Sequence, residues 1–114
     1  MNSNNIQPTT LDEAIAAFAK ILNNGDMVRF VSMAEDDLIT LHHGLGQFIR
    51  NNWGLWDENS PLCKHMRSLG FLHADDMSMS LIREFWNRAN KKPSKLAEEI
   101  AEYKDYWDKN SGCP

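Results

Sequence analysis

The sequence lacks the features of a membrane-spanning, secreted or disulfide-stapled protein. No apolar run approaches the roughly 20 residues that a helix needs to cross a bilayer. Residues 1–8 contain neither the basic region nor the apolar stretch of a signal peptide. Cysteine occurs only at Cys63 and Cys113, without a CxxC pair, so a structural disulfide is not expected. We therefore expect a cytoplasmic protein that makes no membrane contact.

A strong charge of either sign is also missing. Twelve Lys and Arg residues against sixteen Asp and Glu residues give a net charge of −4. Non-specific nucleic-acid binding requires clustered basic residues, so nucleic acid is an unlikely partner. The acidity is too weak for a DNA mimic. The basic residues between positions 83 and 95 are most simply a solvated helix end, although phosphate contact is the alternative.

Strand patterns, internal repeats and low-complexity tracts are nearly absent, whereas helical periodicity is frequent. The length of 114 residues suits one domain, and 42% hydrophobic and 25% charged residues are ordinary for a globular protein. We predict an all-α, single-domain bundle of about five or six helices. The domain is expected to span residues 10–109, between flexible tails at residues 1–9 and 110–114.

The first half of the chain carries two apparent helix starts. Thr10 and Glu13 fit a capping box, which predicts a helix over residues 11–23 that ends at Gly25. Residues 26–31 fit either a helix or a strand, and the lack of a partner strand favours a helix. Ser32 and Glu35 fit a second capping box that opens a helix toward residue 52. Gly44 and Gly46 fall inside that helix and indicate either a break or close packing.

The second half has clearer boundaries. Residues 53–59 are predicted to form a loop, and Ser60 followed by Pro61 predicts a helix that ends at Gly70. Asp75 and Asp76 suit the first turn of the next helix, which Pro93 terminates. A final amphipathic helix follows from the spacing of its apolar residues, which are Leu96, Ile100, Tyr103 and Trp107.

Two segments, residues 42–56 and residues 70–78, concentrate Gly, Trp, His, Arg and acidic residues beyond what helix formation requires. We call them the first and second segments. They resemble a family of small uncharacterised bacterial proteins that contain a domain of unknown function. The matching residues are 49–56, Ser60, Leu62, Gly70, His73 and 75–78. Ala74 replaces a usual Pro and His43 a common aromatic. The resemblance implies a shared fold but no activity.

The polar residues of the two segments have two interpretations. If the segments meet, Arg50 can pair bidentately with Asp75 or Asp76. The group would then be an internal clamp, with Asn51 and Asn52 capping backbone groups. Alternatively, the same side chains would form a polar pocket for a small anion, a nucleotide or a peptide.

Metal binding and nucleophilic catalysis are both disfavoured. The histidines and acids of the two segments are suitable metal ligands, but His42 and His43 are adjacent and point about 100° apart on a helix. Cys63 and His65 would lie on different sides of a helix, and Ser60 is better explained as an N-cap. We therefore predict no catalytic residue, no metal and no cofactor. His73 is expected to cap the following helix.

The four tryptophans provide candidate contact residues. Trp86 and Trp107 follow helical stripes and are expected in the core. Trp53 and Trp56 flank Gly54 in the loop, so they are either core residues or exposed anchors for a partner.

We hypothesise a small protein-interaction module that binds a protein partner through residues 50–56, in an accessory, immunity-like, antitoxin-like or phage counter-defence role. The predicted binding residues are Arg50, Asn51, Asn52, Trp53, Trp56, His73, Asp75 and Asp76. An alternative is a ligand-binding domain or enzyme with a pocket formed by Arg50, Asn52, His73, Asp75 and Asp76. A third possibility is a homo-oligomer in which Tyr103 and Trp107 face a second subunit.

Overall fold

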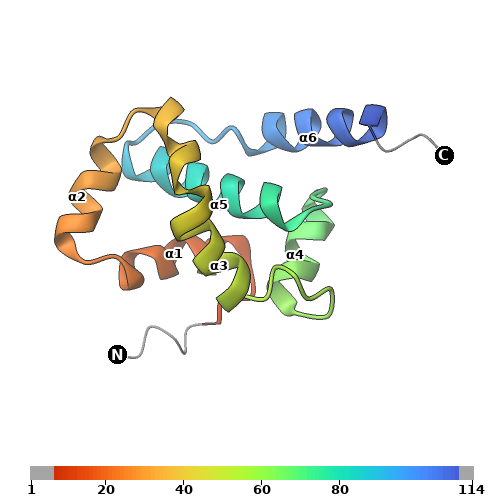
Figure 1. Cartoon of the computed structure of the whole chain (residues 1–114), viewed down its shortest axis with the longest axis horizontal. Coiled ribbons are helices and arrows are strands. Elements are labelled where there is room, and N and C mark those ends of the chain that lie inside the picture. Colours follow the sequence, from red (N-terminus) through yellow and green to blue (C-terminus); the bar gives the residue numbers. More distant parts are fainter. Residues whose placement is uncertain (1–6, 111–114) are drawn as a thin grey trace.

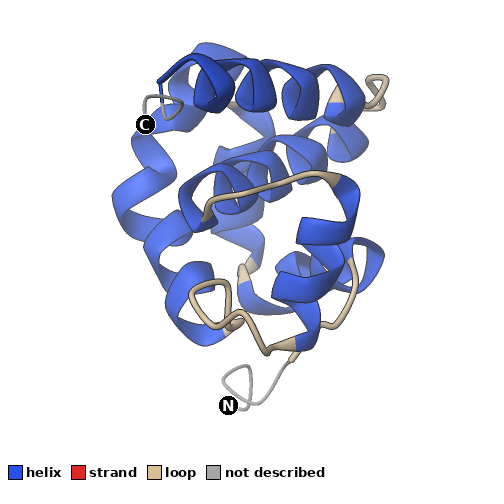
Figure 2. Ribbon diagram, turned by 90° about the vertical axis from the view of Figure 1, so that its right-hand side faces the viewer, coloured by secondary structure: helices blue, strands red, loops and turns tan. Residues whose placement is uncertain are grey.

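The structure is a computed structural model that describes residues 7–110, and within these residues every regular element is a helix (Figures 1 and 2). The prediction of a small all-α domain is therefore confirmed. The elements are α1 (Leu11–Ile21), α2 (Asn24–Ser32), η2 (Glu35–Leu41), η3 (His42–Gly46), α3 (Gln47–Asn52), α4 (Pro61–Leu69), α5 (Ala74–Ala89) and α6 (Leu96–Asn110). No helix in the described part of the chain is long and apolar enough to cross a membrane.

Helix α5 forms the centre of the molecule. Eleven of its sixteen residues are buried, whereas α6 lies along the outside of the fold (Figure 1). An aromatic stack fixes α1 and α2 against α5: Phe85 lies 4.8 Å from Phe18 and 5.1 Å from Phe30 between ring centroids. Such contacts stabilise a core beyond the burial of apolar area alone. The two segments with unusual composition are both anchored to this central helix.

Short-range sequence signals explain most of the helix ends. Thr10 accepts the amide of Glu13 at 3.2 Å, and Ser60 accepts the amide of Cys63 at the same distance. Gly70 ends α4 with a φ of 120°, as its position in the sequence predicts. The segment 26–31 is helical, as expected. Helix α1 ends at Ile21 because Asn23 caps α2 instead of extending α1.

The capping box at Thr10 is only half formed. The Glu13 carboxylate accepts from the backbone N–H and the hydroxyl of Thr9, both at 2.8 Å, and these bonds lower the pKa of Glu13. Pro8 is buried, and Gln7 donates to the carbonyl of Asn52 at 3.1 Å. Residues 7–9 are therefore attached to the domain, which was predicted to begin at residue 10. The rest of the predicted N-terminal tail and residues 111–114 lie outside the described residues.

The prediction of one helix from Ser32 to Asn52 is wrong. Ser32 is the last residue of α2, and the next helix begins after Ala34 without a side-chain cap. The helical stretch then changes from a 3-10 helix in η2 to a π-helix in η3 and an α-helix in α3. A π turn widens the helix locally and is frequent at functional sites. Apolar periodicity reports a helical face but not such a change of winding.

Candidate functional site

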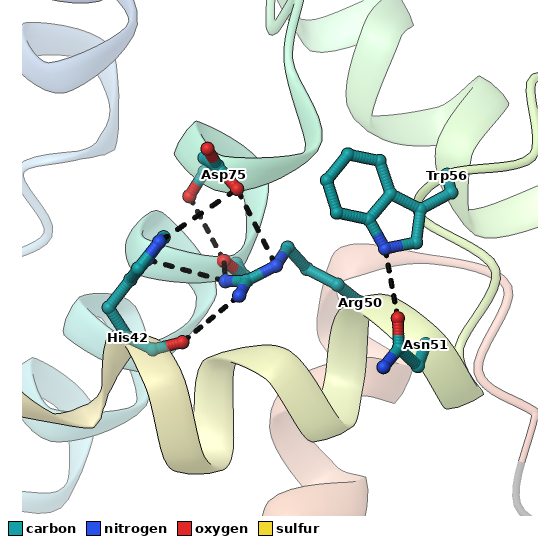
Figure 3. A network of polar contacts seen from close by, with 6 residues as sticks. His42, Arg50, Asn51, Trp56 and Asp75 are labelled. Carbon is teal, nitrogen blue, oxygen red and sulfur yellow. Dashed lines mark hydrogen bonds and ion pairs between the residues drawn. The ribbon is translucent and has the colours of Figure 1, made fainter.

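The Arg50 cluster, which comprises Arg50, His42, Ser78 and Asp75, joins the first segment to the second (Figure 3). Arg50 points from α3 toward α5 and is only 5% exposed. Its Nη1 donates to the Ser78 hydroxyl at 2.9 Å, and its Nη2 donates to the His42 carbonyl at 3.1 Å. The two segments therefore meet through the guanidinium, as the clamp interpretation requires.

The ion pair in this cluster is loose. Arg50 Nε lies 3.5 Å from Asp75 Oδ1, and this buried nitrogen has no hydrogen-bond partner. The Asp75 side chain is 59% exposed. Asp75 is thus the acid that pairs with Arg50, whereas Asp76 makes its contacts elsewhere. Most of the fixation of the guanidinium comes from neutral oxygen acceptors.

His42 contributes to the cluster through its backbone carbonyl as well as through its ring. Its carbonyl accepts from Arg50, and its Nδ1 lies 3.3 Å from Arg50 Nη1. An arginine can only donate, so Nδ1 faces a donor in this contact. The other ring nitrogen, Nε2, is 3.9 Å from Asp75 Oδ1. A role that depends on a backbone carbonyl leaves no residue-type signal, so sequence reasoning did not find it.

Gly46 provides the space that the guanidinium occupies. A Cβ at this position would lie 3.0 Å from Arg50 Nη1 and 3.2 Å from the carbonyl oxygen of Leu41. A Cβ at Gly44 would meet nothing within 4 Å. Of the two explanations offered for these glycines, close packing holds at Gly46, and the helix is also rewound there.

Trp56 is the exposed aromatic of the first segment. Its side chain is 61% exposed, and its indole N–H donates to Asn51 Oδ1 at 3.0 Å (Figure 3). The guanidinium carbon of Arg50 lies 6.0 Å from the Trp56 ring centroid. Asn52 instead donates to the carbonyl of Phe48 at 2.8 Å. The indole of Trp56 is therefore accessible and also oriented.

Trp53 lies in the core, so the indole that was predicted to contact a partner is not on the surface. It is 2% exposed and packs edge-to-face against Phe18, with 5.2 Å between ring centroids. The turn at Gly54, with a φ of 75°, separates the inward Trp53 from the outward Trp56. Trp53 is thus a core residue, whereas Trp56 is exposed, and we remove Trp53 from the candidate contact residues.

The loop between α3 and α4 is tightly held. A Cβ on Gly54 would lie 2.8 Å from Ser60 Cβ, so the backbone approach needs glycine. The Ser60 hydroxyl donates to the Gly54 carbonyl at 2.6 Å, while its oxygen also caps α4. Leu55 is buried next to Trp56. Trp56 is therefore presented on an anchored loop.

His73 and Asp76 lie apart from this surface, beneath α6. The His73 ring lies 3.8 Å from the Trp107 ring between centroids, and the Trp107 indole N–H donates to Asp76 Oδ2 at 2.8 Å. His73 occupies the N-cap position of α5, but its side chain makes no capping hydrogen bond. The prediction that His73 caps this helix is therefore wrong for the side chain.

A surface pocket of about 420 Å³ lies between η2, α5 and α6. Its lining residues are Ile39, His42, Asp75, Asp76, Met79, Arg83, Glu102 and Tyr103. Of the five residues predicted for a polar pocket, only Asp75 and Asp76 belong to this lining. Arg83 donates to the Tyr103 hydroxyl at 3.2 Å, and burial raises the pKa of Tyr103.

The other candidate chemistries gain no geometric support. Within residues 7–110, no group of three or more His, Cys, Asp or Glu side chains is arranged to hold a metal ion. Ser60 acts as an N-cap, and Cys63 is buried in the core. Trp86 is a core residue, as predicted, and its indole donates to the carbonyl of Met33.

Comparison with known proteins places most of the chain in a family. Residues 7–89 match the model of a family described as a domain of unknown function, DUF6794. The match includes both segments and leaves α6 outside. No curated protein and no solved structure matches the chain.

Proposed function

The chain belongs to the DUF6794 family, and from this premise we propose that it is a protein-binding module whose contact surface is centred on Trp56. The observation that carries the proposal is the orientation of an exposed indole on an anchored loop. Tryptophan is enriched among the residues that dominate binding energy at protein interfaces. A side chain that is already fixed loses little conformational entropy when a partner binds.

Residues next to Trp56 suggest the chemistry of the contact. Asn51 orients the indole from one side, and the Arg50 cluster supports the helix end from which the loop departs. Asp57 and Glu58 follow Trp56 directly and are exposed. An apolar anchor beside carboxylates fits a partner surface that combines an apolar recess with basic side chains.

We place this role in the cytoplasm of a bacterial cell, including a cell infected by a phage. An accessory, immunity-like, antitoxin-like or counter-defence function would each require a small domain that recognises another protein. The free, buried thiol of Cys63 is compatible with a reducing compartment.

The variant Trp56→Ala tests the contact surface. Because the indole is mostly exposed, we expect the variant to fold, whereas affinity for the partner should fall at least about 30-fold, the equivalent of a hot-spot loss of about 2 kcal/mol. The partner would be captured from a lysate of the source cells, purified, and titrated against both proteins by calorimetry.

Val28→Ala is the matched control. Val28 is 66% exposed on α2, which lies away from the loop between α3 and α4 (Figure 1). The control should bind the partner as tightly as the unaltered chain. A partner that binds the Trp56→Ala variant with unchanged affinity would disprove the proposed surface.

The alternative is a ligand-binding domain or enzyme that uses Arg50, Asn52, His73, Asp75 and Asp76. One observation favours it, which is the pocket that contains Asp75, Asp76 and the ring of His42. A thermal-shift screen of small metabolites would support this alternative only if Glu102→Gln, at the pocket wall, weakens the hit.

A further inference from the structure

Helix α6 lies outside the family match and covers part of the second segment. The matched region ends at residue 89, and α6 begins at Leu96. Figure 1 shows α6 as an outer helix that runs beside the central helix α5. The residues beneath it include Gly70, His73 and Asp76, which are among those that carry the family resemblance. The second segment therefore serves here as a receptor for a helix.

One face of α6 supplies the contacts. Trp107 covers His73 and donates to Asp76, as described above. Tyr103 lies 6.2 Å from Phe71 between ring centroids, and a Cβ on Gly70 would lie 2.7 Å from Ile100 Cγ2. The spacing of residues 100, 103 and 107 places the three side chains on one helical face. We call the surface beneath α6, formed by Gly70, Phe71, His73 and Asp76, the receptor groove, and it fits an amphipathic helix that carries a tryptophan.

The docking of α6 is incomplete. Of the α6 residues whose side chains are described, none is fully buried. Glu98, Glu99 and Glu102 surround a pocket of about 300 Å³ together with Glu35 and Asp36. Arg83 and Lys95 offset these five carboxylates only in part, and like charges at close range oppose docking. Helix α6 is thus attached with less burial than α5 and against like charge.

The connection between α5 and α6 is exposed and begins with a helix cap. Residues 91–95 are all exposed. Lys91 adopts a φ of 58° at the end of α5, where the N–H groups of Lys91 and Lys92 donate to the carbonyls of Arg88 and Asn87 at 3.1 and 2.8 Å, as in a left-handed helix cap. This cap turns the chain back onto α5. The hinge for an exchange of α6 therefore lies after the cap, and Pro93 disfavours a continuous helix through it.

We propose that the receptor groove is an interaction surface for the α6 helix of a second copy of the chain. The α6 sequence is the one ligand whose fit to the groove is visible, and a second copy brings an identical helix. Docking between copies would make the same contacts as docking within one chain. Reciprocal exchange would close a two-fold dimer with no unpaired groove. This surface is separate from the Trp56 surface, and neither proposal depends on the other.

A shortened hinge tests the exchange. Deleting residues 91–93 prevents α6 from turning back onto its own α5, whereas docking on a second copy stays possible. We expect the deleted chain to have a dimeric mass by light scattering, and we expect addition of Trp107→Ala to return it to a monomer. A deleted chain that retains its helical circular dichroism but stays monomeric would overturn the proposal.

A cross-linking experiment keeps the proposal testable if the deleted chain does not fold. Two full-length chains, each with Cys113→Ser, would carry Leu72→Cys and Asp108→Cys respectively, at exposed positions next to His73 and Trp107. They would be mixed at high concentration and treated with a short thiol-reactive cross-linker. We expect a mixed dimer for this pair and none when Val28→Cys replaces Leu72→Cys. Equal yields for the two pairs, or no dimer from either, would contradict exchange.

Discussion

Arg50 shows how one buried charge can define a site without forming a strong ion pair. The guanidinium leaves water to meet a hydroxyl, a carbonyl and a ring nitrogen, while its acidic partner stays mostly in solvent. Hydrogen bonds that involve a charged group stabilise a fold more than neutral ones do. An exposed ion pair stabilises it little. Arg50 should therefore contribute much more than Asp75 to the free energy of unfolding.

Paired substitutions measure this difference. Arg50→Ala removes the bridge between η3, α3 and α5 and leaves the Ser78 and His42 oxygens without their donor, so we expect a loss of about 2–4 kcal/mol in the free energy of unfolding. Asp75→Ala should cost less than about 1 kcal/mol. Urea denaturation of both variants gives the comparison. Losses of similar size would mean that the ion pair, and not the neutral acceptors, holds Arg50.

At the scale of the element, the rewound helix from η2 to α3 carries the first segment. Its π turn contains Gly44 and Gly46, which lie only two residues apart but in opposite environments. Gly46 packs where the Arg50 guanidinium meets α5, and Gly44 faces open space. Packing therefore requires glycine at position 46 but not at position 44.

Alanine at each glycine gives a matched pair of tests. Gly44→Ala should stabilise the protein by about 0.5–1 kcal/mol, because it lowers the backbone entropy of the unfolded chain at an open position. Gly46→Ala should instead destabilise it by about 1–2 kcal/mol, because the Leu41 carbonyl is backbone and cannot move aside easily. Thermal unfolding compares the two. A gain in stability at both positions would show that the guanidinium adapts without cost.

The same element marks the limit of sequence-based prediction. Caps such as Thr10 and Ser60 act over three or four residues, so their side chains identify the helix starts directly. The false start at Ser32 has equally suitable residues, but α2 extends over it. The change from 3-10 to π winding has no such side-chain signal, and the approach of Gly46 to Ser78 of α5 is a tertiary contact. Local patterns cannot contain that information.

The sequence likewise predicted part of the candidate site, but not the part that depends on tertiary packing. The sequence indicated that Arg50 pairs with Asp75 or Asp76 if the two segments meet, but only the structure selects Asp75. The separation of Trp53 from Trp56 depends on the positive φ of Gly54, and the covering of His73 by Trp107 depends on where α6 packs. Both require the assembled fold, and so the predicted site divides into two surfaces.

At the scale of the whole molecule, α6 is an outer layer whose attachment we expect to depend on pH. Burial raises the pKa of Glu99 when α6 is docked, although the hydrogen bond from Ser80 at 2.6 Å acts in the opposite direction. A raised pKa means that docking favours the protonated acid. The stabilisation is complete below the ordinary carboxyl pKa, near 4.5, and is lost as the pH rises through the raised value.

We therefore expect α6 to be held more tightly in mild acid than at neutral pH. The variant Glu99→Gln removes the charge but keeps an oxygen that can accept from Ser80, so it should protect α6 at neutral pH and weaken the pH dependence. Hydrogen exchange of the α6 amides between pH 5 and pH 8, corrected for the intrinsic exchange rate, measures both effects. Unchanged protection in the variant would show that the charge of Glu99 does not control the docking of α6.

The positions of the four tryptophans have an optical consequence. Trp53 and Trp86 are buried in the core, and Trp56 is exposed to solvent. The Trp107 ring packs against the imidazole of His73. Their fluorescence should therefore separate into a blue-shifted emission and a red-shifted emission that a dissolved quencher can reach. A ligand bound at Trp56 would protect the red-shifted emission from the quencher. Release of α6 would expose Trp107 and increase the fraction of emission that is red-shifted. One unlabelled sample can thus report on both surfaces by emission alone.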